Sequence, residues 1–370
     1  MLAEIGNPDH HYPIIHIGGT NGKGSVAVMV AQALRATGRA VGVYTSPHLV
    51  DVTERVVVNE TPVSQDAFAT WTTRLRPAIE RADASFFEAS TVIALAHFAA
   101  SGVDVAVVEV GLGGRLDSTN VVSPVISVVT SIGIDHAEYL GGTLAEIAGE
   151  KAAIAKPGVP FVVGESDRAI GRVLYDRAAE LGAEAILVPS EDRYAGSLRL
   201  AGSHQQRNAA VARAVLEGLP PDLCVSEEAM TIGFARAWLP GRYERRGRWI
   251  LDVAHNTSAV AVLAETIRAS NPARPVHVLL GVLRDKALMA MAETLTRVAD
   301  RVWLTLPPTA PVHRALSEPP AGLPPGVVFE PDFERALRSF QIGAETLVVT
   351  GSFHTVGDVM TRLPGFQPFG

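Results

Sequence analysis

Cysteine is almost absent from this sequence. Cys224 is the single cysteine in 370 residues, which excludes an internal disulfide framework and a cysteine-cluster metal site. Uncharged apolar runs of about 18 residues are also missing, so we expect no membrane-spanning helix. The opening residues MLAEIGNPDHHYPII contain neither a basic stretch nor an apolar core, so we expect no secretion signal.

Positive charge is scarce as well. The chain carries 32 Lys and Arg residues against 39 Asp and Glu residues, and the net charge is −7. A nucleic-acid-binding surface needs clustered cations to neutralise phosphates, and no basic run is present. With 47% apolar residues available for a core, the composition predicts a soluble, cytoplasmic, globular protein without nucleic-acid or membrane partners.

Short β-branched runs alternate with longer Ala-rich stretches along the chain. Near-continuous apolar strands joined by helices are typical of a parallel sheet covered on both faces, so we predict an α/β fold. Ligands on such sheets bind beyond the carboxyl ends of the strands. The expected strands of the first series span residues 13–17, 40–45, 103–110, 124–132 and 160–164. The expected helices between them span residues 25–38, 65–82, 89–102 and 143–156.

The charged stretch LPGRYERRGR, residues 239–248, interrupts this pattern. A second alternating series follows it, with expected strands at 249–256, 275–283, 301–306, 326–331 and 346–352. We therefore place a domain boundary near residue 241. The prediction is an N-terminal domain of P-loop type with a mostly parallel sheet over residues 1–240, and a smaller Rossmann-like α/β domain over residues 241–370.

The stretch GGTNGKGS, residues 18–25, is a glycine-rich turn between an expected strand and an expected helix. It departs from the general phosphate-loop pattern G-x-x-x-x-G-K-[ST], because Ile17 stands five before Gly22 and Gly24 separates Lys23 from Ser25. Glycines still let the backbone approach an anion at a helix N-terminus, and Lys23 can reach the outer phosphates. An ordinary glycine turn is the alternative, but Lys23 and Ser25 in these positions favour a nucleotide site.

Further strings follow this loop in a fixed order: TSPHL with ER (45–55), EVGLGGRLDSTN (109–120), TSIGIDH (130–136), EKAAIAK (150–156), LPGR (239–242), LDVAHN (251–256), RDK (284–286) and GSFHTVGDVM (351–360). This ordered set resembles the folylpolyglutamate synthase/dihydrofolate synthase family of the muramyl-ligase superfamily. The resemblance runs from about residue 5 to residue 360. It implies an ATP-dependent, ADP-forming ligase that adds L-glutamate to a folate or to dihydropteroate, with ATP and two Mg²⁺ ions, acting as a monomer.

The expected chemistry requires a phosphate cradle and a few hard ligands at neighbouring strand ends. The ATP γ-phosphoryl group activates a carboxylate as an acyl phosphate, and the amine of glutamate attacks it. The resemblance implies an ATP site made of Gly19, Thr20, Asn21, Gly22, Lys23, Gly24, Ser25, Asn208, Arg242 and Asp252. It implies metal ligation by Ser46, Glu109, His136 and Lys151, and catalytic roles for Lys23, His136, Lys151 and His255.

The residues themselves add support to part of this set. Glu109 closes an apolar run, where an unpaired carboxylate is costly, so it needs a partner; a salt bridge to Arg115 is the structural alternative. His136 also follows an apolar run at an expected strand end. For Lys151 only the resemblance speaks, and it implies a lysine carbamylated by CO₂. Lys286 and Ser352 match further motif positions of the second domain.

The resemblance places the pteroate-binding segment at SFFEAST and RLDS. The substrate residues it implies are Phe86, Phe87, Glu88, Leu116, Asp117 and Ser118. A flat pterin ring needs an aromatic wall and a polar group at its edge, and Phe87 with Glu88 or Asp117 can supply both. Adjacent aromatic residues in a core are the alternative interpretation.

The chain departs from the family before the phosphate loop, where the family has several dozen residues that include a segment in contact with the pterin. Either the start is late, or part of the dihydropteroate site is missing. Two alternative functions remain: a different muramyl-type amide ligase, which the strings TSPHL and RLDSTN argue against, and a nucleotide-binding protein without ligase activity.

Overall fold

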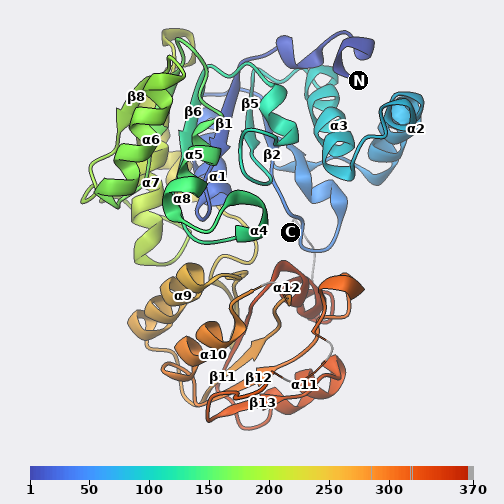
Figure 1. Cartoon of the computed structure of the whole chain (residues 1–370), viewed down its shortest axis with the longest axis vertical. Coiled ribbons are helices and arrows are strands. Elements are labelled where there is room, and N and C mark those ends of the chain that lie inside the picture. The colour runs from blue at the N-terminus through green and yellow to red at the C-terminus, as the bar shows by residue number, and fades with distance from the viewer. Residues whose placement is uncertain (285, 317, 319, 366–370) are drawn as a thin grey trace. The chain divides into compact units, whose positions relative to one another are not determined.

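The computed structural model describes residues 1–365 except residues 285, 317 and 319. The described residues form two compact units. The first contains residues 1–199 and 205–239, and the second contains residues 200–204 and the chain from residue 240 onward. Each unit has its own sheet, and the elements of both can be followed in Figure 1. Among the described residues, no helix combines the length and the apolarity needed to cross a membrane.

The first unit is built on an eight-stranded sheet, counted over the described residues, with the order β4-β3-β2-β5-β1-β6-β7-β8. Its strands are β1 (Ile14–Gly18), β2 (Val41–Tyr44), β3 (Val56–Val58), β4 (Thr61–Pro62), β5 (Val105–Glu109), β6 (Ile126–Val129), β7 (Pro160–Val163) and β8 (Glu184–Leu187). Only the β2–β3 and β3–β4 pairs are antiparallel. The central strands β1, β5 and β6 are buried along their whole length, as the apolar runs predicted.

Helices cover this sheet. They are α1 (Lys23–Arg35), α2 (Gln65–Ala82), α3 (Phe86–Ala100), α4 (Ala137–Leu140), α5 (Leu144–Ala152), α6 (Arg168–Glu180), α7 (Ser203–Glu217) and α8 (Glu227–Arg236). Buried side chains of α3 pack with those of β2 and β5, and buried side chains of α5 and α6 pack with those of β6 and β7. Because β2, β5, β1 and β6 run parallel side by side, their carboxyl ends meet at one edge of the sheet.

The second unit contains a six-stranded sheet over the described residues, with the order β13-β12-β11-β14-β10-β9. Its strands are β9 (Glu244–Arg246), β10 (Trp249–Leu251), β11 (Val276–Leu280), β12 (Arg301–Leu304), β13 (Val327–Phe329) and β14 (Thr346–Thr350), and its helices are α9 (Thr257–Ser270), α10 (Leu288–Thr296), α11 (Phe333–Phe340) and α12 (Phe353–Met360). Only β9 is antiparallel to its neighbour. The predicted α/β class with mostly parallel sheets is therefore confirmed.

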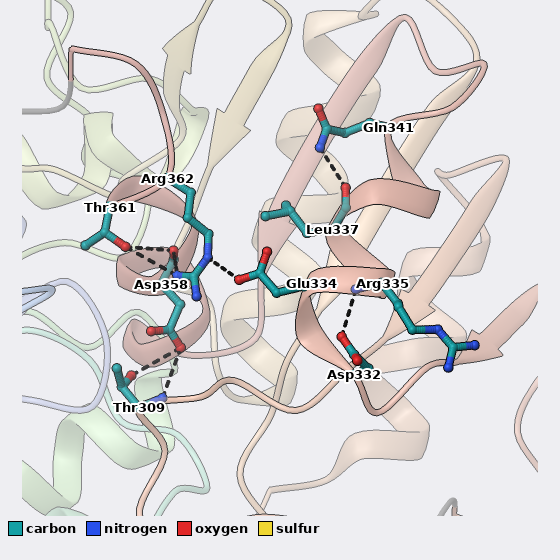
Figure 2. A network of polar contacts seen from close by, with 9 residues as sticks. All are labelled: Thr309, Asp332, Glu334, Arg335, Leu337, Gln341, Asp358, Thr361 and Arg362. Atoms are coloured by element: carbon teal, nitrogen blue, oxygen red, sulfur yellow. Dashed lines mark hydrogen bonds and ion pairs between the residues drawn. The ribbon is translucent and has the colours of Figure 1, made fainter.

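A polar network of the second unit fastens the loop after β12 to α12 (Figure 2). The buried Asp358 carboxylate of α12 accepts hydrogen bonds from the Thr309 N–H and hydroxyl, each at 3.2 Å. Just beyond the helix, Arg362 donates to Glu334 of α11 at 2.7 Å. Burial raises the pKa of the Asp358 carboxyl group. These contacts hold the loop and both helices together.

Candidate active site

The phosphate loop, residues 18–25, requires glycine at two positions. Gly19 has a φ of 138°, and a Cβ there would lie 2.1 Å from the Thr130 hydroxyl. Gly22 has a φ of 85°, and a Cβ there would lie 2.6 Å from Asn208 Oδ1. Both positions combine a left-handed backbone with a close neighbour, so only glycine fits. Asn208, an expected ATP residue of α7, therefore lies directly against the loop.

Hydrogen bonds to the end of β6 hold the loop in place. The hydroxyl groups of Thr130 and Ser131 donate to the Asn21 carbonyl at 2.7 and 3.0 Å. The Thr20 N–H donates to the Ser131 carbonyl at 2.7 Å, and the Thr20 hydroxyl donates to the Gly133 carbonyl at 3.2 Å. Helix α1 begins at Lys23, where N–H groups of the first turn point out of the helix end. The loop is therefore a fixed cradle for an anion.

An expected catalytic residue, Lys23, and an expected metal ligand, Glu109, meet beside this cradle. Lys23 Nζ lies 3.8 Å from Glu109 Oε1, and the two side chains are only 16% and 5% exposed. Glu109 ends β5 opposite Ile17 of β1, so the strand pairing brings it to the loop. Arg115 instead pairs with Glu150, at 3.2 Å. The alternative of a salt bridge between Glu109 and Arg115 is thus wrong, because α5 places Glu150 beside the arginine.

Lys151 of α5 is buried beside the phosphate loop. It is 5% exposed, and its ammonium donates to the Gly19 carbonyl at 3.0 Å. Burial, followed by the nearby positive charge of Lys23, lowers the pKa of Lys151 to about 7. Lys151 is therefore neutral in a large share of molecules at neutral pH, which an exposed lysine is not.

Three expected site residues surround Gly111, two positions after Glu109. A Cβ on Gly111 would lie 3.2 Å from Asp117 Oδ2, 3.6 Å from Ser46 Oγ and 3.9 Å from Phe87 Cδ1. These side chains come from the segment after β5, from the loop after β2 and from the first turn of α3. The Asp117 carboxylate also accepts the Leu112 N–H at 2.8 Å. A polar cluster thus lies next to the Lys23–Glu109 pair.

An aromatic wall, made of Phe86 and Phe87, borders this cluster. The two phenylalanines meet edge to face at 5.7 Å between ring centroids. They are 51% and 50% exposed, and Leu116 is 79% exposed, so these residues do not belong to the core. Large apolar side chains gathered at a polar site are a common mark of ligand binding.

Two other expected substrate residues have structural partners. The Glu88 carboxylate reaches back to its helix N-cap and accepts from the Ser85 N–H and hydroxyl at 2.8 and 2.7 Å. These bonds lower the pKa of Glu88. The Ser118 hydroxyl lies 2.8 Å from the Thr91 hydroxyl of α3. The Ser118 contact ties the segment that carries Asp117 to α3.

Arg55, which the sequence analysis quoted only within the ER string and gave no role, lies against the aromatic wall. Its guanidinium carbon lies 5.1 and 5.5 Å from the ring centroids of Phe86 and Phe87. The residue is 4% exposed, its Nε donates to His48 Nδ1 at 2.9 Å, and its Nη1 makes no hydrogen bond among the described residues. A buried guanidinium with a donor to spare can bind a substrate carboxylate. An arginine directly before the apolar run VVV was the available signal.

The expected metal ligands come from four different segments. Ser46 and Glu109 are placed as described above, and His136 is the N-cap of α4, with its Nε2 3.9 Å from Asp135 Oδ1. Within the described ranges, no group of three or more His, Cys, Asp or Glu side chains forms a metal site. The chemistry of the donor set nevertheless suits Mg²⁺, since a carboxylate and a hydroxyl are the oxygen ligands it prefers.

The second unit holds Asp252, Arg242 and His255 around the carboxyl end of β10. Asp252 accepts the Tyr243 and Ala254 N–H groups at 2.8 and 2.9 Å, and burial raises the pKa of its carboxyl group. The Arg242 guanidinium carbon lies 5.3 Å from the Phe353 ring centroid, and the His255 ring lies 5.9 Å from it. Sequence reasoning quoted Phe353 only within a motif and missed this contact.

Two further motif positions in this unit have different outcomes. Ser352 caps α12, where its hydroxyl accepts the Thr355 N–H at 3.1 Å. Of the RDK string, Asp285 lies outside the described residues, whereas the Lys286 N–H donates to the Leu283 carbonyl at 3.1 Å. These hydrogen bonds of Ser352 and Lys286 stabilise the local backbone and do not indicate which ligand either residue would bind.

Two family descriptions match the chain. Residues 17–195 match the Mur ligase middle domain, and residues 241–353 match the glutamate ligase domain of Mur ligases. With two parallel-dominated sheets and a phosphate loop of matching type, these define the class as an ATP-dependent, ADP-forming amide ligase.

Similar proteins narrow this class. The dihydrofolate synthase/folylpolyglutamate synthase of Bacillus subtilis is 31% identical over 98% of this chain and 93% of its own length. The bifunctional folylpolyglutamate synthase/dihydrofolate synthase of Yersinia pestis, complexed with AMPPNP and Mn ion, has a TM-score of 0.85 at 32% identity, covering 98% of this chain and 91% of that chain. Escherichia coli FolC, in complex with DHPP and ADP, has a TM-score of 0.83 at 32% identity, covering 96% and 90%. The chain belongs to the folylpolyglutamate synthase/dihydrofolate synthase family, which confirms the resemblance inferred from its motifs.

Proposed function

We propose that this protein joins the amine of L-glutamate to the carboxylate of a pteroyl substrate, with ATP converted to ADP and phosphate. The substrate is tetrahydrofolate, dihydropteroate or both, and the protein acts as a monomer. Family membership and the arrangement of the site support this function. The Escherichia coli relative in complex with DHPP and ADP supports a nucleotide and a pterin compound as ligands.

One observation supports the proposal most strongly: a phosphate cradle and an exposed aromatic wall lie next to one another at the ends of β1 and β5. Glu109 pairs with Lys23 of the cradle at 3.8 Å, and two positions later Gly111 contacts the cluster of Ser46, Asp117 and Phe87. A nucleotide-binding protein without ligase activity has no use for the second half of this arrangement. A carboxylate held against the aromatic wall would lie beside the ATP γ-phosphate, as acyl phosphate formation requires.

The reaction then proceeds in two steps. A carboxylate oxygen of the pteroyl substrate attacks the γ-phosphorus, the bond to the β–γ bridging oxygen breaks, and ADP leaves. The glutamate amine attacks the acyl carbon, loses a proton, and phosphate leaves with one former carboxylate oxygen. Lys23 lies where it can neutralise charge on the transferred phosphoryl group. Arg55, stacked on Phe86 and Phe87, is placed to orient the carboxylate.

Ser46, Glu109, His136 and Lys151 are the residues that would hold magnesium. When bound, Mg²⁺ neutralises charge on the phosphates of ATP. The Yersinia pestis relative complexed with AMPPNP and Mn ion supports a divalent metal beside the nucleotide, and two Mg²⁺ ions are part of our proposal. We further propose that neutral Lys151 adds to CO₂ and loses a proton, becoming a carbamate anion. Its burial and its pKa of about 7 support this.

The remaining assignments follow the two units. Residues 1–240 form the ATP-binding domain, with nucleotide contacts from the phosphate loop (Gly19 to Ser25) and Asn208. Residues 241–370 form the Rossmann-like ligase domain, in which Arg242 and Asp252 bind the nucleotide and His255 acts in catalysis. Arg242 stacks on the Phe353 ring, and the Asp252 carboxylate accepts hydrogen bonds from two backbone N–H groups. These contacts hold both side chains in fixed positions, which supports their roles.

The test is a paired assay of ADP release with dihydropteroate or tetrahydrofolate, each with and without L-glutamate, analysed by product mass. We expect ADP only when both co-substrates are present, and a mass increase of one or more glutamyl residues. Product with both acceptors indicates a bifunctional enzyme. Glutamate-independent ADP formation, or a product only with a muramyl acceptor, would contradict the proposal. Light scattering of the same sample checks the monomer.

A further inference from the structure

The Asp117 carboxylate is connected to a buried histidine of the central sheet. His16 lies on β1 with no exposed surface, and its Nε2 is 2.8 Å from the Thr119 hydroxyl. That hydroxyl contacts Asp117 Oδ1, which also accepts the Thr119 N–H at 2.9 Å. The other carboxylate oxygen accepts the Leu112 N–H at 2.8 Å. A chain of hydrogen bonds thus runs from β1 to the edge of the aromatic wall.

The available protons fix the direction of this chain. A carboxylate oxygen only accepts, so the single proton of the Thr119 hydroxyl points to Asp117. The hydroxyl oxygen must then accept from His16, which requires the ring proton on Nε2. The other ring nitrogen, Nδ1, is buried and has no hydrogen-bond partner among the described residues. An unpaired lone pair at Nδ1 is tolerated better than an unpaired N–H, so both ends of the ring favour the same tautomer.

The histidine keeps this form across the working pH range. Burial, followed by the positive charge of Lys156, lowers the pKa of His16 to about 3. The neutral ring is therefore a fixed donor and does not act as a pH switch. Both oxygens of Asp117 are then held by donors of the protein, and Oδ2 lies 3.2 Å from the position of a Cβ on Gly111.

We propose that His16 is a positioning residue: through Thr119 it holds the Asp117 carboxylate in the orientation that receives the pteroyl substrate. This inference rests on the role of Asp117 in the proposed function. A carboxylate that is oriented before the substrate arrives does not lose side-chain freedom on binding. The consequence is a contribution to substrate affinity from a residue that never touches the substrate.

The tautomer is tested without any activity. Nitrogen-15 NMR of the histidine-labelled full chain, with His16 assigned by its loss in His16→Gln, should show the Nε2–H tautomer from pH 6 to pH 8. The chain has 11 histidines, and the signals that disappear from the spectrum of the variant identify His16 among them. A ring protonated on Nδ1, or one that titrates in this range, would overturn the proposal.

Kinetics test the functional part. His16→Leu and Thr119→Val should each raise KM for the pteroyl substrate about tenfold, because one hydrogen bond to the carboxylate chain is lost. KM for ATP should not change. His16→Gln and Thr119→Ser each keep a donor in place and should restore most of the affinity, which a role in packing alone does not predict.

The variant Asp117→Asn distinguishes the positioning role of His16 from the substrate-binding role of Asp117. If it raises the pteroyl KM while His16→Leu and Thr119→Val do not, the chain from His16 has no positioning role. If Asp117→Asn also has the wild-type KM, Asp117 itself must be removed from the proposed function. The positioning role of His16 then fails with it, whatever the tautomer.

Discussion

The phosphate loop and the aromatic wall are built in opposite ways, although they border the same site. The loop is tied to Thr130 and Ser131 by hydrogen bonds, Lys151 beside it is buried, and the Lys23 side chain is only 16% exposed. The aromatic wall leaves Phe86 and Phe87 about half exposed, over a single buried guanidinium. The part that binds phosphate is therefore complete in the fold, whereas the wall keeps apolar surface in water that a flat ring can cover.

This difference teaches where rate and affinity come from. Phosphoryl transfer depends on charges held within fractions of an ångström, and these belong to the rigid side. Covering apolar surface contributes to binding of both substrate and transition state, and so changes KM more than kcat. If the comparison is correct, substitutions at the loop lower kcat, and substitutions at the wall raise KM for the pteroyl substrate.

Lys23→Met has the largest expected effect. It removes the ammonium that neutralises the transferred phosphoryl group but keeps most of the side-chain volume, so kcat should fall about 1000-fold. ADP formation under saturating substrates measures this. Arg35→Met, a loss of charge at the far end of α1, is the matched control and should keep wild-type kcat. A folded Lys23→Met enzyme with normal turnover would show that the phosphate loop does not bind the nucleotide.

Glu109→Gln should lower kcat by about 100-fold or more, because it keeps the shape and removes a charge that a divalent metal requires. The activity should also demand more Mg²⁺, which a magnesium titration measures. Glu60→Gln is the control, since Glu60 is exposed and pairs with Arg35 on the surface. Activity at wild-type magnesium requirement would show that Glu109 is not a ligand.

Lys151→Met should lose roughly as much activity as Glu109→Gln, and yet its folded state should be more stable than that of the wild type. The folded-state pKa of about 7 lies below the ordinary value of 10.5, so between these values only the unfolded chain binds the proton, and wild-type stability rises with pH. Below pH 7 the full cost of the buried charge is present. The variant should therefore gain about 1–3 kcal/mol in free energy of unfolding at pH 6, and less at pH 9.

Urea unfolding of wild type and Lys151→Met in CO₂-free buffer measures that gain. Removing CO₂ should also lower wild-type activity, and bicarbonate should restore it. An equally stable variant at pH 6 would contradict the burial of a charged lysine. Wild-type activity that does not depend on CO₂ would contradict the carbamate.

Phe87→Ala has the smallest expected effect and acts on the other side of the comparison. Loss of the ring should raise KM for the pteroyl substrate about tenfold, with kcat and KM for ATP little changed. Phe87→Leu keeps apolar surface without the aromatic face and should fall between Phe87→Ala and wild type. A drop in kcat alone would place Phe87 with the catalytic groups and break the comparison.

The sequence predicted the rigid side better than the open one. Apolar runs located β1, β5 and β6, and residues after parallel strands meet at one edge, so Lys23 and Glu109 could be expected together. For Phe86 and Phe87 only the resemblance indicated a substrate wall, because adjacent aromatic residues otherwise usually indicate a core. Their place in the first turn of α3, after the cap Ser85, keeps them outside the core.

Tertiary partners explain the other misses. Arg55 is buried by rings about 30 residues away, and no local pattern indicates this. The charged strand β9 lacks the alternation of apolar and polar residues that indicates a strand. Residues 239–248 were therefore predicted only as an interruption between the two series of strands and helices. The sequence left open a salt bridge between Glu109 and Arg115. In the structure Arg115 pairs with Glu150 of α5 instead.

Oxygen transfer from the pteroyl carboxylate to phosphate is the most direct test of the account. The wild-type enzyme would be given a pteroyl substrate labelled with oxygen-18 in the reacting carboxylate, together with ATP and L-glutamate, and the released phosphate analysed by mass. An acyl phosphate requires that each phosphate carry one labelled oxygen. Unlabelled phosphate formed alongside a glutamylated product would contradict activation of the carboxylate at this site.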